Sequence, residues 1–390
     1  MNDFSRITRG IRAGIESDTG QGSVVPPIYL STNYTFTGLG EPRDFDYSRS
    51  RNPTRALLGE AVATLEGGAG GVITASGMGA VSTVLHALLG PSDTVIIPHD
   101  CYGGTWRIFD AYHRKGLCRV VTIDFTDLDQ VRKAVAEHRP RLVWVETPSN
   151  PLLRLTDLAE VVAIAHAADA LVLADNTFLS PILQRPLEHG VDLVMHSTTK
   201  YINGHSDVVG GAVISATSEL HEQISWWANT IGVTGGAFDS YLTIRGLRTL
   251  HTRIRAHEEN AAAVVGLLTD HDAVRVVHHP SLPDHPGHEI AARQQDGFGS
   301  IVSLELHGGR DAVTAFAAAL QCFSLAESLG GTESLVCHPS SMTHAAMTPE
   351  AQAVAGLSDG LVRLSVGIEP AEDLVADLTA GLDAAAHTHD

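Results

Sequence analysis

The sequence predicts an α/β fold with a mostly parallel central sheet and a smaller C-terminal α+β domain. Between residues 56 and 215, short apolar runs alternate with amphipathic helical segments. Such βαβα alternation favours a parallel sheet that is covered by helices on both faces. Hydrophobic residues make up 44% of the 390 positions and charged residues 18%, which is typical of a well-packed enzyme of one or two domains.

The predicted elements follow from apolar periodicity and from the turn residues between the runs. We expect strands at 71–75, 94–98, 119–123, 141–146, 170–174, 191–195 and 208–214. Between them we expect helices at 57–65, from 76–80 onward, and at 106–115, 128–138 and 158–168. The C-terminal part is predicted to hold strands at 300–306 and 361–366 and helices at 311–320 and 371–386.

Three segments are expected along the chain. Residues 1–55 show little periodic pattern, and so long an irregular segment is expected to pack on a neighbouring subunit rather than stand alone. Residues 56–256 would form the domain that binds the ligand, and residues 257–390 the C-terminal domain. The boundary, near residue 257, falls inside a long helical region predicted over 241–268.

Composition excludes several classes of function. The formal net charge of −19 argues against nucleic-acid and anionic-membrane binding. No run of about 18 apolar residues predicts a transmembrane helix, and the N-terminus has no apolar signal segment. The cysteines are scattered, which fits a reducing cytoplasm. The 21 histidines show no metal-ligand spacing, so we expect no metal site.

The lysines single out one position. The chain has three: Lys115, Lys133 and Lys200. The first two lie in charged, helix-like segments, whereas Lys200 follows the strand at 191–195 in an uncharged, hydroxyl-rich turn. Such a turn can desolvate the amine, lower its pKa and make it a nucleophile toward a carbonyl. Asp175 closes the strand at 170–174 in the same way.

Other polar groups also follow predicted strands. Ser76, Gly77 and Met78 open a helix directly after a strand, which is a site for anions, although glycine also occurs in such turns for steric reasons alone. Tyr102 follows the strand at 94–98, where open α/β sheets bind ligands or where a tyrosine simply packs on the sheet edge. Asn150, between two prolines, either aims a hydrogen bond or forms a plain turn.

These groups together match one cofactor. A planar pyridine aldehyde with a phosphate, pyridoxal 5′-phosphate (PLP), would use them all. The lysine binds the aldehyde covalently, and the carboxylate keeps the ring nitrogen protonated so that the ring withdraws electrons. The aromatic side chain stacks on the ring, and the helix N-terminus holds the phosphate.

The sequence also resembles a known family, the Cys/Met-metabolism PLP enzymes, which have the aspartate-aminotransferase-like PLP fold. The resemblance covers nearly the whole chain. It rests on the motifs YSRSRNPTR (47–55), ASGMGA (75–80), HDCYGGTWR (99–107), ETPSNP (146–151), ADNTF (174–178), HSTTKYINGHSDVVGG (196–211), AESLGGTESL (326–335) and RLSVGIE (363–369).

The resemblance implies a set of cofactor residues. Lys200 would carry PLP and move protons, Asp175 would pair with the ring nitrogen, and Tyr102 would stack on the ring. The phosphate would be bound by Gly77, Met78, Ser197 and Thr199, and by Tyr47 and Arg49 of a neighbouring subunit. The active unit would then be a homodimer, and two dimers usually form a tetramer in such families.

Tyr47 and Arg49 alternate, so both would point one way in an extended chain, although a surface loop with an arginine–carboxylate pair is the alternative. Arg51 departs from the family pattern, because many relatives have glycine at this position. An additional arginine near the cofactor could alter the affinity for an acidic acyl group, in a direction that the sequence does not reveal.

The resemblance further implies γ-replacement on an O-acyl-L-homoserine, with the O-succinyl ester favoured. L-cysteine would replace the acyloxy group at Cγ and give L-cystathionine and succinate. Arg363 would clamp the substrate α-carboxylate, helped by Asn150 and the backbone of Ser328. The distal pocket would be lined by Asp46, Arg107 and Glu327.

Several alternatives stay open. Glu327 with Ser328 does not separate replacement from γ-elimination of cystathionine, and sulfide is an alternative nucleophile. Leu329 argues against β-elimination, because relatives with that activity tend to carry tryptophan at this position. A non-catalytic PLP-binding protein on the same fold is the alternative from another functional class.

Overall fold

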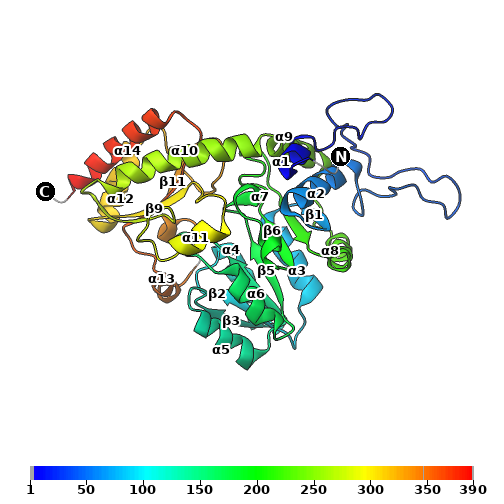
Figure 1. Cartoon of the computed structure of the whole chain (residues 1–390), viewed down its shortest axis with the longest axis horizontal. Helices are drawn as coiled ribbons and strands as arrows, with labels where there is room; N and C mark the ends of the chain where they lie inside the picture. The colour runs from blue at the N-terminus through cyan, green and yellow to red at the C-terminus, as the bar shows by residue number, and fades with distance from the viewer. Residues whose placement is uncertain (1–3, 346, 389–390) are drawn as a thin grey trace.

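The computed structural model describes residues 4–345 and 347–388, which form two sheets that lie side by side (Figure 1). Within these residues the larger sheet has seven strands: β1 (Gly70–Thr74), β2 (Thr94–Pro98), β3 (Arg119–Ile123), β4 (Leu142–Glu146), β5 (Leu171–Asp175), β6 (Leu193–His196) and β7 (Gly211–Ser215). Their order is β1-β7-β6-β5-β4-β2-β3. Only β7 is antiparallel to its neighbours in this described sheet, so the mostly parallel sheet is confirmed.

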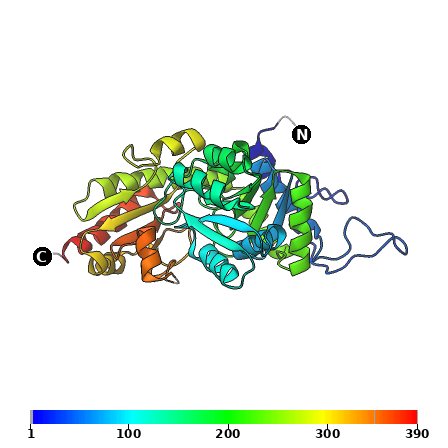
Figure 2. The ribbon, with the colours of Figure 1, turned by 90° about the horizontal axis from the view of Figure 1, so that it is seen from below.

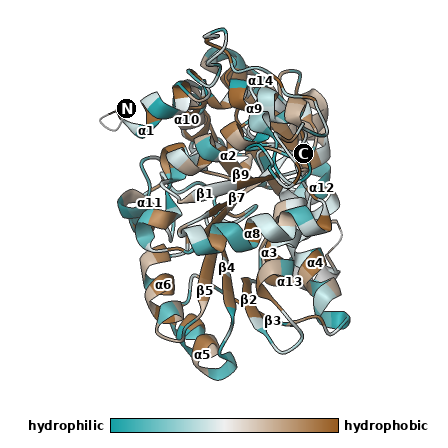
Figure 3. Ribbon diagram, turned by 90° about the vertical axis from the view of Figure 1, so that its right-hand side faces the viewer, coloured by the Kyte–Doolittle hydropathy of each residue, from teal (hydrophilic) through white to brown (hydrophobic). Residues whose placement is uncertain are grey.

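Helices cover both faces of the larger sheet. They are α2 (Pro53–Glu66), α3 (Gly77–Leu88), α4 (Gly103–Arg114), α5 (Leu128–His138), α6 (Leu158–His166), α7 (Ser180–Leu183), α8 (Ser218–Ile231) and α9 (Ala237–Leu247). Because successive strand residues point to opposite faces, β5 contributes Val172 to the core under α2, α5 and α6 and Leu173 to the core under α3, α4 and α8. Figure 3 accordingly shows β2, β4 and β5 as hydrophobic throughout.

The smaller sheet belongs to the C-terminal part of the chain. Its strands, in the order β10-β11-β12-β9-β8, are β8 (Val274–His278), β9 (Ile301–Leu306), β10 (Ser324–Leu325), β11 (Leu335–Cys337) and β12 (Leu361–Ser365). The helices associated with this part are α10 (Leu250–Thr269), α11 (His288–Gln294), α12 (Gly309–Ala319), α13 (Pro349–Ala355) and α14 (Ala371–Ala386). The predicted smaller α+β unit is therefore present, with strands β8, β10 and β11 in addition to those expected.

The long helix predicted over 241–268 is two helices, so that prediction is wrong. α9 ends at Leu247 and α10 begins at Leu250. At the break, the Thr249 hydroxyl donates to the Gly246 carbonyl, 3.0 Å away, and satisfies a carbonyl that a continuing helix would have used. α10 then runs from the larger to the smaller sheet: Leu250 and Ile254 pack in the first core, and Val264 and Leu268 in the C-terminal core.

Within the described residues, five helices were not predicted: α1, α7, α8, α11 and α13. α8 carries Leu220, Ile224 and Ala228 at four-residue spacing, an amphipathic signal that the sequence does contain. α1 (Arg6–Ile11) lies inside the segment expected to be irregular. Its six residues are too few for apolar periodicity to be recognised.

In the arm, residues 4–52, helix α1 packs against α2, and the segment after it extends away from the body of the molecule in two loops (Figures 1 and 2). Tyr47 and Arg49 do not lie in an extended chain, because the amides of Ser50 and Arg51 both donate to the Tyr47 carbonyl and form a turn. The Arg49 guanidinium carbon lies 5.7 Å from the centre of the Tyr47 ring instead.

Membrane-spanning helices and metal clusters are both absent from the described residues. Over 4–345 and 347–388, no helix is long and apolar enough to cross a membrane. In the same ranges, no group of three or more His, Cys, Asp or Glu side chains is arranged to hold a metal ion.

One prediction concerns the contact between α2 and β1. A Cβ atom at Gly59 would lie 2.4 Å from the Gly71 carbonyl oxygen, so Gly59→Ala must push the helix from the sheet. We expect it to lower the free energy of unfolding by about 1–3 kcal/mol. Gly266→Ala is the matched control, because α10 has open space there, and it should stabilise by up to about 1 kcal/mol. Urea unfolding at equal protein concentration measures both, and equal effects would contradict this packing.

Candidate active site

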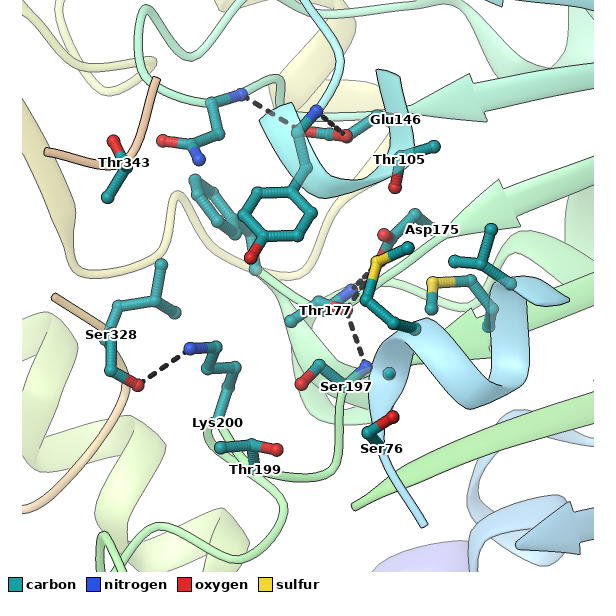
Figure 4. Close-up of a pocket in the computed structure, with 18 of the residues that line it drawn as sticks. Ser76, Thr105, Glu146, Asp175, Thr177, Ser197, Thr199, Lys200, Ser328 and Thr343 are labelled. Carbon is teal, nitrogen blue, oxygen red and sulfur yellow. Dashed lines mark hydrogen bonds between the residues drawn. The ribbon is translucent and has the colours of Figure 1, made fainter. Parts of the chain in front are cut away.

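A cavity of about 340 Å³ lies at the carboxyl ends of the parallel strands (Figure 4). This is where open α/β sheets bind ligands, and the volume is in the range of small-molecule sites. β4, β5 and β6 lead into it, and β12 of the smaller sheet contributes Arg363. Residues predicted for the site that line it are Gly77, Met78, Tyr102, Asn150, Asp175, Ser197, Thr199, Lys200, Glu327, Ser328 and Arg363.

One wall of the cavity is the N-terminus of α3. Ser76 caps the helix, and its hydroxyl accepts a hydrogen bond from the Gly79 amide at 2.9 Å. The amides of Gly77 and Met78 belong to the first turn, so helix geometry gives them no partner within α3. A Cβ atom at Gly77 would lie 2.9 Å from the Ser197 Cβ, so glycine lets the two loops approach closely. This arrangement suits an anion.

Asp175 is the last residue of β5. Its carboxylate accepts hydrogen bonds from the Thr177 amide (3.0 Å) and hydroxyl (2.5 Å). Thr177 in turn accepts the Ser197 amide at 2.9 Å, which fixes the two loops together. Burial raises the pKa of Asp175 despite these bonds. A cationic N–H at this place would therefore be stabilised by the carboxylate.

Lys200 lies in the turn after β6, across the cavity from Asp175 (Figure 4). Its Nζ donates to the Ser328 hydroxyl at 2.7 Å. Burial, and then the nearby Arg363 guanidinium, lower the pKa of Lys200 to about 8. At pH 7 about one tenth of this amine is therefore neutral and nucleophilic, far more than of an ordinary lysine.

Arg363 is buried on β12 and joins the two parts of the chain. Its Nη1 donates to the Asn150 side-chain oxygen and its Nη2 to the Ser328 carbonyl, each at 2.9 Å. Ser328 has a φ of +87°, a strained conformation for a residue with a side chain. Arg363 Nε is buried without a partner within the described residues, and a carboxylate of a ligand would satisfy it.

The structure does not bring every predicted residue to this cavity. Asp46, Tyr47 and Arg49 lie on the arm, and Arg49 Nη1 donates to the Asn229 carbonyl at 2.8 Å. None of the three lines the cavity of its own chain, in so far as the structure describes it, and neither does Arg107. Their roles stay predictions.

Sequence reasoning left Glu146 and Thr177 without a role, although both line the cavity. Glu146 ends β4, as Asp175 ends β5, so the rule that selected Asp175 could have selected Glu146 too. Thr177 follows Asp175 by two residues, and aspartate commonly accepts hydrogen bonds at that spacing. Both signals were present in the sequence.

Arg51 lies outside the cavity as well. Its guanidinium carbon is 5.1 Å from the centre of the Phe45 ring, so in this chain it packs within the arm. Its predicted influence on acyl-group affinity stays untested.

Comparison with known proteins identifies the family. The model of the Cys/Met metabolism PLP-dependent enzymes matches residues 7–383. The chain belongs to this family. It is 53% identical over 380 residues to the cystathionine gamma-synthase of Escherichia coli (strain K12), which covers 97% of this chain and 98% of the relative. The predicted family and PLP dependence are confirmed.

Solved structures of the family agree with the fold. Cystathionine gamma synthase from Xanthomonas oryzae pv. oryzae, in complex with aminoacrylate and cysteine, is 59% identical with a TM-score of 0.98, and the match covers 99% of both chains. The predicted fold class is thereby confirmed. The family also includes other activities: a cystathionine beta-lyase of Lactococcus lactis subsp. cremoris (strain MG1363) is 44% identical over 96% of this chain and 98% of the relative.

The cavity fits the cofactor of this family. A phosphate matches the free amides at the start of α3, and a ring N–H would relieve the buried charge of Asp175. The amine of Lys200, with its lowered pKa, suits an aldehyde. One detail differs from expectation: the Thr199 hydroxyl already bonds the Gly210 backbone, donating at 3.2 Å and accepting at 3.0 Å.

A prediction follows for the reactivity of Lys200. In protein freed of PLP, its acylation by acetic anhydride should rise with pH to a midpoint near its pKa of about 8, because only the neutral amine reacts. Mass spectrometry of the lysine-containing peptides measures each site separately. The exposed Lys115 and Lys133 are internal controls. A Lys200 midpoint no lower than theirs would contradict a desolvated amine.

Proposed function

We propose that the chain is a cystathionine γ-synthase that replaces the succinyloxy group of O-succinyl-L-homoserine by the sulfur of L-cysteine, giving L-cystathionine and succinate in methionine biosynthesis. The main support is a single cavity that holds both a desolvated amine, Lys200, and a buried guanidinium with an unused donor, Arg363. Such a pair suits an amino-acid substrate. The similarity to cystathionine gamma-synthases over nearly the whole chain supports the choice of reaction.

Five groups would hold PLP in this cavity. Lys200 would bind its aldehyde, Asp175 its ring nitrogen, and the first turn of α3 with Ser197 its phosphate, while Tyr102 would stack on the ring. When bound, PLP supplies a ring that withdraws the negative charge developing on the substrate carbons. Burial keeps the pKa of Tyr102 above its ordinary value, so its hydroxyl stays neutral near pH 7.

The chain's own residues then bind the substrate and move its protons. Arg363, aligned by Asn150, would clamp the α-carboxylate and so fix Cα beside Lys200. Lys200 Nζ would remove the Cα proton and, after releasing it, a Cβ proton, which allows the Cγ–O bond to break and succinate to leave. The cysteine thiol then loses its proton, its sulfur bonds to Cγ, and Lys200 returns protons to Cβ and Cα. A long side chain suits a base that serves more than one carbon. Glu327 lines the cavity, and we assign it with Asp46 and Arg107 to the distal part of the pocket.

The assay described below also distinguishes the related reactions: β-elimination, γ-elimination and replacement by sulfide. Leu329, in place of tryptophan, favours γ-chemistry over β-elimination, although beta-lyases occur among the relatives. γ-Elimination and the use of sulfide share the same core residues. A cytoplasmic location also stays part of the proposal.

The assay compares two reactions of the purified protein. With O-succinylhomoserine plus cysteine we expect cystathionine, followed by chromatography, and a panel of acetyl and phospho esters and of sulfide ranks the substrates. Lys200→Ala should lower kcat by about 100- to 10,000-fold, because it removes the proton carrier. Rapid release of pyruvate or 2-oxobutyrate from cystathionine, without synthesis, would indicate a lyase. A protein that turns yellow with PLP but converts none of these substrates would be the non-catalytic alternative, and one that stays colourless would contradict the proposed cofactor.

We also propose that the active unit is a homodimer, with two dimers forming a tetramer. The arm exposes large apolar side chains, including Val24, Leu30 and Phe36, with 63%, 72% and 48% of their surface accessible. Large apolar side chains that gather on one exposed segment support a subunit contact there. Tyr47 and Arg49 would then reach the phosphate in the neighbouring subunit's cavity.

Subunit mixing tests the shared site. Arg49→Ala and Lys200→Ala are each expected to be poorly active alone. After the two are unfolded and refolded together, half of the dimers should be mixed and each should hold one intact site, so activity should return to about a quarter of wild type. As the control, each variant is unfolded and refolded on its own. No recovery in mixed samples that do form dimers would show that Arg49 serves its own chain or neither.

A further inference from the structure

We propose that Glu146 and Asp100 are a reciprocal pair of positioning residues that fix the ring-stacking Tyr102 relative to the carboxylate clamp of Asn150 and Arg363. Glu146 ends β4 and accepts a hydrogen bond from the loop after β2, whereas Asp100 lies in the loop after β2 and accepts one from the loop after β4. This inference rests on the proposed function, because it concerns how the proposed ligand groups are held.

Glu146 provides the first half of the pair. It is the last residue of β4 and is buried. One carboxylate oxygen accepts the Tyr102 amide at 2.8 Å, and the other accepts the Asn150 amide at 3.1 Å (Figure 4). One side chain therefore holds the backbone of both residues that are expected to touch the ligand.

Asp100 provides the second half, in the opposite direction. It is buried in the loop after β2, two residues before Tyr102. Its carboxylate accepts the Ser149 hydroxyl at 2.7 Å and Arg154 Nη1 at 3.0 Å, both from the loop after β4. The loop that carries Asn150 is thus attached to the loop of Tyr102 by two separate carboxylates.

The position of the Asn150 loop also determines the position of the Arg363 guanidinium. Its Nη1 donates to the Asn150 side chain, whose backbone amide is held by Glu146. A shift of the Asn150 loop would move the guanidinium and with it the bound carboxylate. Tyr102 begins α4 without a side-chain cap, so the Glu146 bond is the side-chain contact that fixes its backbone within the described residues.

The charges around Glu146 make a carboxylate at this position unfavourable for the stability of the fold, which points to a role in the site instead. Glu146 and Asp175 are direct neighbours in the register of β4 and β5, so both carboxylates point to the same face of the sheet. Burial and the charge of Asp175 raise the pKa of Glu146 well above its ordinary value, and the two amides only partly oppose this. A carboxylate beside another buried carboxylate is unfavourable for stability alone.

The experiment uses the PLP-bound enzyme and Glu146→Gln. The amide keeps one acceptor oxygen, but its NH2 group faces the other backbone N–H, so one of the two loops loses its partner. We expect KM for the amino-acid substrate to rise about 10- to 100-fold with a smaller change in kcat. We also expect a changed visible circular dichroism of bound PLP and weaker PLP binding by the apo-protein, because both depend on the ring stacking of Tyr102.

The matched control is Asp127→Asn. Asp127 also accepts two backbone amides, those of Asp129 and Gln130, but it caps α5 on the surface and does not line the cavity. It should leave KM and the dichroism unchanged. Thermal unfolding of all variants separates a loss of stability from a loss of positioning.

A second, milder variant is Ser149→Ala, which removes a single bond to Asp100. It should raise KM a few-fold and leave the dichroism of PLP unchanged, because Glu146 still holds Tyr102. If Glu146→Gln folds and lowers only the unfolding temperature, or if Ser149→Ala matches Asp127→Asn in KM, the inference is wrong. A wild-type protein that binds no PLP would instead refute the proposed function.

Discussion

The burial of charge at the carboxyl ends of β4, β5 and β6 is the constraint on which the site depends. Parallel pairing brings Glu146 and Asp175 into direct register, and the turn after β6 places Lys200 across the same cavity. Each of these groups is shifted away from its charged form by burial. The two apolar cores of the larger sheet hold the strands firmly enough to keep such groups in place.

Sequence patterns located this sheet and its ends well. Strands buried on both faces read as continuous apolar runs, and a polar residue ends each run, which is why β2 was predicted with the bounds that the structure gives. The same reasoning selected Asp175, Tyr102 and Lys200, since their positions depend on local strand ends. The family motifs then added residues that no local pattern identifies.

Other features depend on contacts that a sequence does not express. Arg363 and Asn150 are 213 positions apart and meet only because the smaller sheet packs against the larger one. Glu146 acts on backbone amides, which leave no trace in the side-chain pattern of its partners. At the break between α9 and α10, the Gly246 carbonyl accepts the Thr249 hydroxyl and the Arg253 guanidinium, in a segment whose composition suits a continuous helix.

α10 also has a consequence for the molecule as a whole. One half of this helix is buried in the core of the larger sheet and the other half in the core of the smaller sheet. A single helix thus connects the larger and the smaller sheet. A movement of one sheet relative to the other would bend this helix or expose apolar side chains that are now buried. A gene fragment cut near residue 257 would leave each product with half a helix and an uncovered apolar stripe. The wall of the cavity that carries Arg363 is therefore connected to the wall that carries Lys200 through the packing of α10 in both cores.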